Sequence, residues 1–331
     1  MSATIIDVAH HCNVSPGIVS RVLDASRADI GEDLRRTILE SAQALGCVPS
    51  AKTHRLGVLF MDESAKGLTH PFFAAVLDAF KVAAESKGYD VTFINHRIGD
   101  NVMTYLEYCQ YRRLDGVCIA CIDFEDPQVV ELVKSGIACV TVDHIYKKIP
   151  SVLSDNETGV QKLVEHAISM GHKRIAFIHG HNNSIVTRTR IKQFHQTMQF
   201  YKLPVPEEYV RGSLYGDIGL ARKIVGELLR LPERPTCILL PDDLSYLGAM
   251  DAARELRFSI PGEISFAGYD GIPMMQAISP RLTTVRQQCD SIGEEAAKRL
   301  IGLIENPGVG SWLPTVVPIE FLSGGTVGKM K

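Results

Sequence analysis

From Leu56 onward the sequence alternates short apolar runs with longer amphipathic segments, and this alternation limits the possible folds more than any other feature. The apolar runs predict strands at residues 56–61, 89–95, 115–121, 137–142, 174–179, 236–240, 264–268 and 282–285. The segments between them predict helices at 71–87, 101–112, 126–134, 156–170, 188–201, 218–230, 243–257 and 290–304. This order is typical of doubly wound, mostly parallel α/β sheets with right-handed crossovers.

The α/β region is too long for a single sheet domain, so we expect two lobes. Asp155 begins a new helix and marks a first crossing between them. The chain should cross back near residues 286–289 and again near 313, before a last strand around 316–321. We therefore assign residues 57–154 with 289–313 to an N-terminal lobe. The C-terminal lobe takes residues 155–288 with 314–331.

Composition places the 331-residue chain among soluble globular proteins, with 45% hydrophobic and 22% charged residues. No apolar run reaches the roughly 18 residues of a membrane span, and Asp7, His10 and His11 interrupt the N-terminal segment where an export signal would need an apolar core. We therefore expect a cytoplasmic protein without membrane contact. Eight scattered cysteines fit reduced, mostly buried thiols.

Signals of catalysis and metal binding are weak. Cys118 and Cys121 have a metal-ligand spacing, but they lie on an apolar run with no second ligand pair nearby. The sequence contains no glycine-rich phosphate loop, no nucleophile elbow and no paired-histidine zinc motif with a glutamate. Asp242 and Asp243 are adjacent carboxylates, yet neighbours on a loop usually point apart. We expect neither an enzyme nor a cofactor or metal site.

Upstream of the lobes, Thr4 to Leu23 predicts two short helices joined by a tight turn. Thr4 is placed to cap the first helix, with Asp7 at the reciprocal third position. One apolar face of that helix is spaced at i, i+3, i+4 and i+7, and it consists of Ile5, Val8, Ala9 and Cys12. Ser15 caps the second helix and Pro16 occupies its first position, where a missing N–H costs nothing.

In the second helix, Val19, Val22 and Leu23 face the first helix. The outward positions are Pro16, Gly17, Ser20 and Arg21. A third helix presents an apolar face and stops at Gly46; the face consists of Leu34, Ile38, Leu39, Ala42 and Leu45. Three such helices complete a small helix-turn-helix headpiece over residues 1–46, whose second helix would enter a DNA major groove. Charge alone does not indicate DNA, because residues 1–56 hold six Lys and Arg against six Asp and Glu.

These residues carry a resemblance to a known family. The runs 4–9, 14–15 and 19–23 resemble the headpiece signature of the lactose repressor (LacI/GalR) family of bacterial transcriptional regulators. Further family-like motifs recur at residues 115–117, 171–176, 268–270 and 282–285. The resemblance implies a two-lobed, periplasmic-binding-protein-like domain after the headpiece, a homodimer and an effector site between the lobes.

The linker at residues 47–56 departs from the family. It is shorter by roughly the length of a hinge helix, and it has no leucine where the family places the wedge that enters the minor groove. Lys52, His54 and Arg55 either contact DNA or belong to a solvated linker. The expected DNA-binding residues are Thr4, Ser15, Pro16, Gly17, Ser20, Arg21, Lys52 and Arg55.

Ligands of open α/β lobes bind beyond the carboxyl ends of the strands. The loops there supply carboxylates, an arginine, an amide and aromatic rings: Phe72, Phe73, Asp143, Arg190, Tyr215, Asp242, Asp270 and Gln287. The resemblance assigns effector binding to Arg190 and an aromatic platform to Tyr215, whereas Asp242 stands where the family more often has Asn. Many directional hydrogen bonds beside a flat apolar face favour a sugar, with a nucleobase as the main alternative.

We therefore predict a transcriptional regulator, most simply a repressor, that binds double-stranded operator DNA under control of a small carbohydrate. A dimer is favoured over a tetramer, because the glycine-rich C-terminus after Phe321 has no heptad repeat. The alternative is a sugar-binding component of a transport system. That reading requires an export signal and no headpiece.

Overall fold

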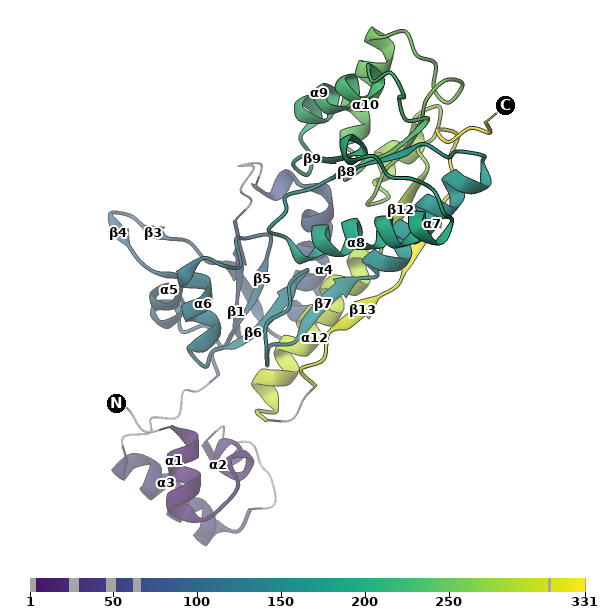
Figure 1. Cartoon of the computed structure of the whole chain (residues 1–331). Coiled ribbons are helices and arrows are strands. Elements are labelled where there is room, and N and C mark those ends of the chain that lie inside the picture. The colour runs from purple at the N-terminus through teal and green to yellow at the C-terminus, as the bar shows by residue number, and fades with distance from the viewer. Residues whose placement is uncertain (1–3, 24–29, 46–51, 62–66, 309–310, 331) are drawn as a thin grey trace.

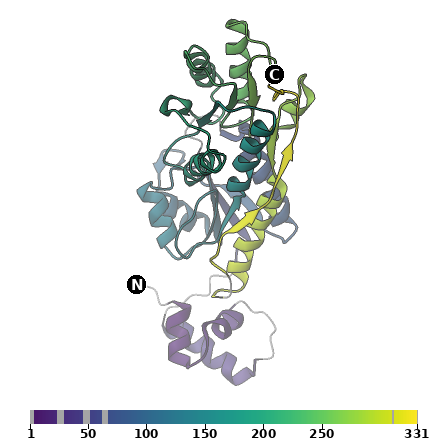
Figure 2. The same ribbon diagram turned by 45° about the vertical axis from the view of Figure 1, so that its right-hand side comes forward.

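The computed structural model describes residues 4–23, 30–45, 52–61, 67–308 and 311–330, apart from the side chains of Ser20, Arg21 and Gln43. The described chain forms a three-helix headpiece and two α/β lobes (Figure 1). Figure 2 shows the headpiece below one end of the first lobe, with the second lobe stacked above the first. In the described ranges, no helix is both long and apolar enough to cross a membrane.

The headpiece consists of α1 (Ile5–Cys12), α2 (Pro16–Leu23) and α3 (Glu32–Ala44). Its core contains two residues from each helix: Val8, Ala9, Val19, Val22, Ile38 and Ala42. The predicted face of α3 is too wide, because Leu34, Leu39 and Leu45 are 37–40% exposed. Two eight-residue helices cover only a narrow stripe of α3, so positions beside Ile38 and Ala42 stay at the surface.

The first lobe is built on six parallel strands in the order β13-β7-β6-β5-β1-β2. Their bounds are β1 (Arg55–Phe60), β2 (Asp90–Phe93), β5 (Gly116–Ala120), β6 (Ala138–Val142), β7 (Ser151–Ser154) and β13 (Thr315–Val317). One face packs against α4 (Pro71–Glu85) and α12 (Cys289–Glu305), and the other against α5 (Tyr105–Arg112) and α6 (Pro127–Lys134). Smaller elements are η1 (Gly67–Thr69) and the hairpin of β3 (Arg97–Ile98) and β4 (Asn101–Val102). Helices on both faces bury the central strands, which explains their apolar sequences.

The second lobe has four parallel strands in the order β11-β10-β8-β9: β8 (Ile175–His179), β9 (Val210–Gly212), β10 (Cys237–Leu239) and β11 (Ser265–Ala267). An antiparallel pair, β12 (Thr284–Gln287) and β14 (Ile319–Leu322), continues this lobe. One face carries α7 (Asn156–Ser169) and α8 (Ile185–Phe200), and the other α9 (Ile218–Leu229) and α10 (Ser245–Glu255). Short η2 (Glu207–Tyr209) and α11 (Pro273–Ala277) complete it.

The chain passes between the lobes at Asp155, at Gln288 and at Pro318. The first two crossings lie where the sequence predicts them. The third lies later than residue 313, because the predicted strand at 316–321 is two strands in different sheets, β13 paired with β7 and β14 paired with β12. Pro318 separates them, and proline has no N–H to continue a ladder. Residues 315–317 therefore lie in the first sheet, and their assignment to the C-terminal lobe is wrong.

The end of the linker is bonded to the first lobe. The carboxylate of Asp115 accepts hydrogen bonds from the backbone N–H of Thr53 at 3.1 Å and of His54 at 2.7 Å. Arg55 already belongs to β1, so the linker ends earlier than the predicted residue 56. The predicted linker residues up to 51 lie outside the described residues.

Candidate functional site

A cavity of about 340 Å³ is lined by residues of both lobes. Its walls are formed by the segments that follow β1, β5, β6, β8, β9 and β11, together with the end of β12. The cavity therefore lies beyond the carboxyl ends of the strands, where ligands of open α/β sheets bind. Seven of the eight predicted effector residues line it: Phe72, Phe73, Asp143, Arg190, Tyr215, Asp270 and Gln287.

Arg190 projects from α8 and is only 5% exposed. Its Nε donates to Oδ1 of Asn156 at 2.7 Å, and its Nη1 donates to the carbonyl oxygen of Pro241 at 3.2 Å. Its Cζ lies 3.5 Å from the centroid of the Tyr269 ring, a cation–π contact. The guanidinium is therefore fixed in position before any ligand arrives.

Acceptor groups surround this cation. Asp143 directly follows β6 and has a left-handed backbone (φ 61°), and its Oδ1 is buried without a hydrogen-bond partner among the described residues. Burial raises the pKa of Asp143 to about 6, although the charge of Arg190 opposes the rise. Gln287 donates from Nε2 to Oδ1 of Asp270 at 2.7 Å, while its own buried Oε1 likewise has no partner in the described chain. Buried oxygens of this kind favour a ligand that brings hydrogen-bond donors.

Burial also shifts the pKa of Asp270. Burial is the main reason that the pKa of Asp270 lies well above its ordinary value, and the nearby carboxylates of Asp243 and Asp242 add to the rise. Its backbone N–H donates to the carbonyl oxygen of Val285 at 2.8 Å. Ligand hydroxyls that donate to Asp270 would favour its charged form.

Tyr215 is fixed from two sides. Its hydroxyl lies 2.9 Å from Oγ1 of the fully buried Thr187, and its ring packs against Gly180 so closely that a Cβ there would lie 2.1 Å from Cε2. The next residue, Gly216, donates its backbone N–H to Oδ2 of Asp242 at 2.7 Å. The platform is thus set by main-chain and side-chain bonds together.

Asp242 does not line the cavity, in contrast to the prediction. It is 2% exposed, and besides Gly216 it accepts from the backbone N–H of Ser245 at 2.8 Å and from the Ser245 hydroxyl at 3.0 Å. The carboxylate is turned toward the first turn of α10, where free N–H groups need acceptors. Asp242 therefore positions the loop that carries Tyr215.

The two predicted phenylalanines both reach the cavity. Phe72 is nevertheless 5% exposed and belongs mainly to the first-lobe core, whereas Phe73 is half-buried. The Phe73 ring meets Phe60 at 5.7 Å and Phe72 at 4.9 Å between centroids, both edge-on. This packing holds the Phe73 ring at the wall.

One group of residues at the cavity rim was not predicted from the sequence. Phe124 follows β5 and stacks on His144, which follows β6, with centroids 4.1 Å apart and planes 5° apart. His181 and Asn183, from the segment before α8, line the cavity as well. The strand-end rule already selected Asp143, and applied equally to β5 it selects Phe124.

The headpiece presents the predicted DNA-binding residues in part. Thr4 caps α1 and forms a capping box with Asp7, and it is exposed, as are Ser15 and Pro16. Gly17 is half-buried at the start of α2. Ser20 and Arg21 lie on α2, between the buried Val19 and Val22, but their side chains are outside the described set.

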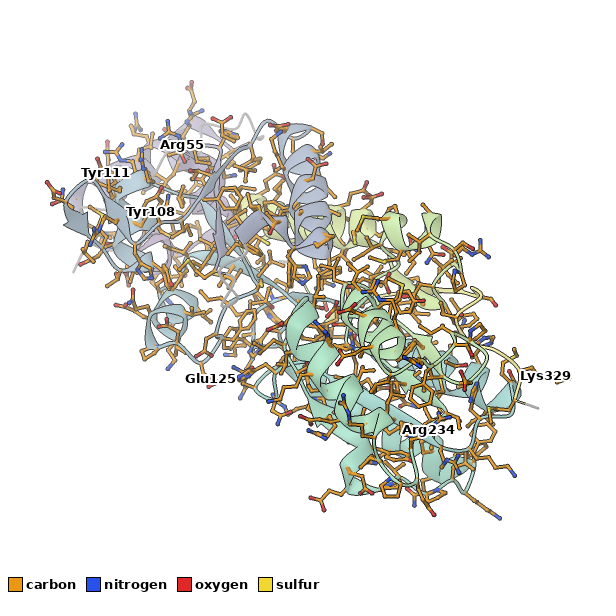
Figure 3. All side chains as sticks on the ribbon, turned by 90° about the horizontal axis from the view of Figure 1, so that it is seen from above. Arg55, Tyr108, Tyr111, Glu125, Arg234 and Lys329 are labelled. Atoms are coloured by element: carbon orange, nitrogen blue, oxygen red, sulfur yellow. The ribbon has the colours of Figure 1, made fainter. Side chains whose placement is uncertain are left out.

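Beyond the headpiece, Lys52 is half-buried, while Arg55 is exposed at the start of β1. In Figure 1, β1 begins at the end of the sheet that faces the headpiece. Figure 3 labels Arg55 on the first lobe, and its side chain is exposed.

Comparisons with known proteins agree with this architecture. A family model described as a periplasmic binding protein-like domain matches residues 164–320. The HTH-type transcriptional repressor PurR of Proteus mirabilis is 29% identical over 329 residues, covering 92% of this chain and 91% of the relative. PurR of Actinobacillus pleuropneumoniae is 28% identical over 315 residues, with 92% and 91% covered.

Solved structures match as well. A regulatory protein of the LacI family from Chloroflexus aggregans superposes with a TM-score of 0.73 at 24% identity, over 84% of this chain and 99% of that one. The lac repressor dimer, bound to operator and an anti-inducer, covers 99% and 100% with a TM-score of 0.70 at 22% identity, a likeness of fold. Over most of its length, the chain is thus similar to HTH-type transcriptional repressors and to regulators of the LacI family. Two features of the site in this chain are Asp242, which does not line the cavity, and the stacked Phe124–His144 pair.

Proposed function

We propose that this chain is a DNA-binding transcriptional repressor whose affinity for its operator is set by a small polyhydroxylated ligand held between the lobes. The observation that carries the proposal is the joining of two parts in one chain. A helix-turn-helix headpiece precedes a cavity whose walls come from two lobes connected by three crossings. A binding protein of a transport system would share the lobes but has no use for the headpiece.

The headpiece would bind DNA through the exposed start of α2. Pro16 and Gly17 are small, so the backbone of this turn can approach the duplex closely. Ser20 and Arg21 follow on α2, and an arginine at this place can contact a base edge or an adjacent phosphate. Thr4 and Ser15, at the starts of their helices, fit phosphate contacts, because helix N-termini carry free N–H groups. Lys52 and Arg55 add charge at the headpiece end of the body.

A single headpiece contacts a short site, so we propose a homodimer that reads a pseudo-palindromic operator. Two-fold protein symmetry then matches two half-sites about one helical turn apart, roughly 34–36 Å. The ligand would act by changing the separation of the two headpieces when the lobes close. It can shift the operator affinity only by the difference between its affinities for the two lobe arrangements.

The chemistry of the cavity favours a sugar over a nucleobase. Asp143 Oδ1 and Gln287 Oε1 are buried acceptors in need of donors, and Asp270 lies beside them. Arg190 supplies donors in a planar fork that matches two adjacent oxygens. A polyol offers many hydroxyls that both donate and accept, whereas a purine offers few N–H groups. Phe73 and Tyr215 provide flat apolar faces for the C–H side of a sugar ring.

The test measures binding of a labelled DNA fragment from the region upstream of the protein's own coding sequence. Fluorescence anisotropy is recorded without ligand and then with a panel of pentoses, hexoses, hexuronates and purine bases. We expect specific binding that one class of sugar weakens. No specific binding under any condition would falsify the proposal.

Two variants connect the cavity to the response. Arg190→Ala and Asp270→Ala should abolish the effect of the sugar while the protein still binds DNA. In the wild type, a ligand at a hundred times its Kd should add about 2.7 kcal/mol to the free energy of unfolding. If both variants keep that stabilisation, the cavity is not the ligand site.

A further inference from the structure

The cavity has a deep part and a rim that differ in chemistry. The deep part contains Arg190, Asp270, Gln287 and Asp143, and Arg190 and Gln287 are about 5% exposed. Phe124 and His144 are half-buried, as are Asp143 and Asp270, and His181 at the rim is exposed. We expect one sugar ring to bond to these deep donors and acceptors. The rim groups lie outside that set and offer their own surface.

On the first lobe, the rim is formed by the stacked rings of Phe124 and His144, which we call the ledge. Phe124 and His144 stack in parallel at 4.1 Å, and the Tyr146 ring meets His144 at 4.5 Å from the side. The Tyr146 hydroxyl donates to the carbonyl oxygen of Phe124, which fixes the loop that carries the ring. Two loops from different strands therefore present one rigid flat surface before binding, an arrangement that reduces the ordering cost of a ligand.

On the second lobe, the segment before α8 that contains His181 and Asn183 is also held in place by hydrogen bonds. Arg188 donates from Nη1 to the carbonyl oxygens of Asn183 at 2.7 Å and Asn182 at 3.3 Å, which ties the loop to the start of α8. His181 and Asn183 then line the cavity opposite the ledge. Figure 3 shows Glu125 at the surface of the first lobe on the side turned toward the second.

The polar groups around the ledge are suited to hydrogen-bond the hydroxyls of a second saccharide. Asp123 and Glu125 flank Phe124 in sequence, line the cavity and are exposed, so their carboxylates can accept from ligand hydroxyls in solvent. The Asn183 amide can both donate and accept. The total volume of about 340 Å³ falls within the range of roughly 300–1,000 Å³ typical of small-molecule pockets.

We propose that Phe124 and His144 form an outer subsite for a second sugar ring, so that the effector is a disaccharide rather than a monosaccharide. The proposal rests on the function proposed above. It adds that the ring bound by Arg190 and Asp270 is joined to one stacked on the ledge, across from Asn183. The ledge then contributes to specificity, because a monosaccharide leaves it uncovered.

The test compares sugars in matched sets by calorimetry with the full-length protein: glucose with cellobiose and maltose, galactose with lactose and melibiose, and xylose with xylobiose. We expect at least one disaccharide to bind ten times more tightly, or better, than either of its single rings. Phe124→Ala should reduce that advantage about tenfold, because one flat face is lost. His144→Ala should reduce it in the same direction.

Phe200→Ala is the matched control, since Phe200 is 78% exposed at the far end of α8 and does not line the cavity. It should leave every affinity unchanged. Equal affinities for single and double rings, equal losses for both in Phe124→Ala, or no binding by any sugar would each overturn the subsite. Operator binding in the same preparation separates the two proposals: if a sugar still weakens DNA binding but the ledge test fails, only the subsite is wrong.

Discussion

Gly180→Ala is the substitution for which the structure makes the most definite prediction. An alanine Cβ at this position would lie 2.1 Å from Cε2, 2.3 Å from Cζ and 2.7 Å from Cδ2 of Tyr215. No such contact is tolerated, so the ring must move. The ring cannot shift freely, because its hydroxyl is bonded to Thr187 and the Gly216 N–H is bonded to Asp242.

The size of the effect follows from these contacts. Overpacking a well-filled site costs typically about 1–3 kcal/mol, and losing the Tyr215–Thr187 hydrogen bond costs a further ~0.5–1.5 kcal/mol. We expect the free energy of unfolding to fall by about 2–3 kcal/mol. Ligand affinity should fall about tenfold or more, since each ~1.4 kcal/mol corresponds to a factor of ten and the displaced ring lines the cavity.

A double-mutant cycle tests whether the contact between residue 180 and the Tyr215 ring causes these losses, without knowledge of the relaxed structure. Tyr215→Ala removes the ring, so Gly180→Ala should cost almost nothing in that background, with a coupling of about 1–3 kcal/mol. Chemical denaturation gives the stabilities and calorimetry gives the affinities. Gly302→Ala in α12 is the control, because no atom lies within 4 Å of its added Cβ, and it should be neutral or slightly stabilising. Additive effects of the two substitutions would refute the contact as the cause.

Further substitutions separate the parts of the molecule. Ile38→Ala removes a fully buried headpiece side chain, so DNA binding should be lost while calorimetry shows unchanged ligand affinity; a loss of both would mean that the headpiece is not an independent unit. Asp115→Ala releases the N–H groups of Thr53 and His54, and operator affinity measured by anisotropy should fall with the loosened attachment; unchanged affinity would contradict that role. Burial raises the pKa of Asp243 from 3.8 to about 7, so the folded state holds this proton more tightly and the free energy of unfolding should decrease as pH rises from about 4 to about 7. Asp243→Asn should flatten that decrease in denaturant titrations, and an unchanged slope would show that another group causes it.

Elements with strong periodicity could be predicted from the sequence. The buried β5 and the capped α1 lie where the apolar run and the Thr4–Asp7 pair place them. The short strands β7 and β9 were not predicted, because three or four residues carry too little pattern to separate a strand from a loop. The break between β13 and β14 at Pro318 was not predicted either, because the residues on both sides of it are strand formers.

A simple geometric rule predicted which side chains gather at one cavity. Strand ends meet at one edge of a parallel sheet, which brings Asp143, Arg190 and Asp270 to one cavity from loops far apart in the sequence. Asp242 follows a strand as well, but its carboxylate is used by Gly216 and Ser245, a competition that only the folded chain reveals. The direction of a loop side chain depends on such local partners, and the order of the strands does not reveal which partners these are.

The central claim is that one ligand and one DNA site are coupled through the two lobes. The most direct measurement determines the Kd of the most stabilising sugar with and without saturating operator DNA, beside the Kd of operator with and without that sugar. Thermodynamic linkage requires the two ratios to be equal. We expect operator DNA to weaken sugar binding by the same factor by which the sugar weakens operator binding. A sugar affinity that does not change when DNA is bound would contradict it.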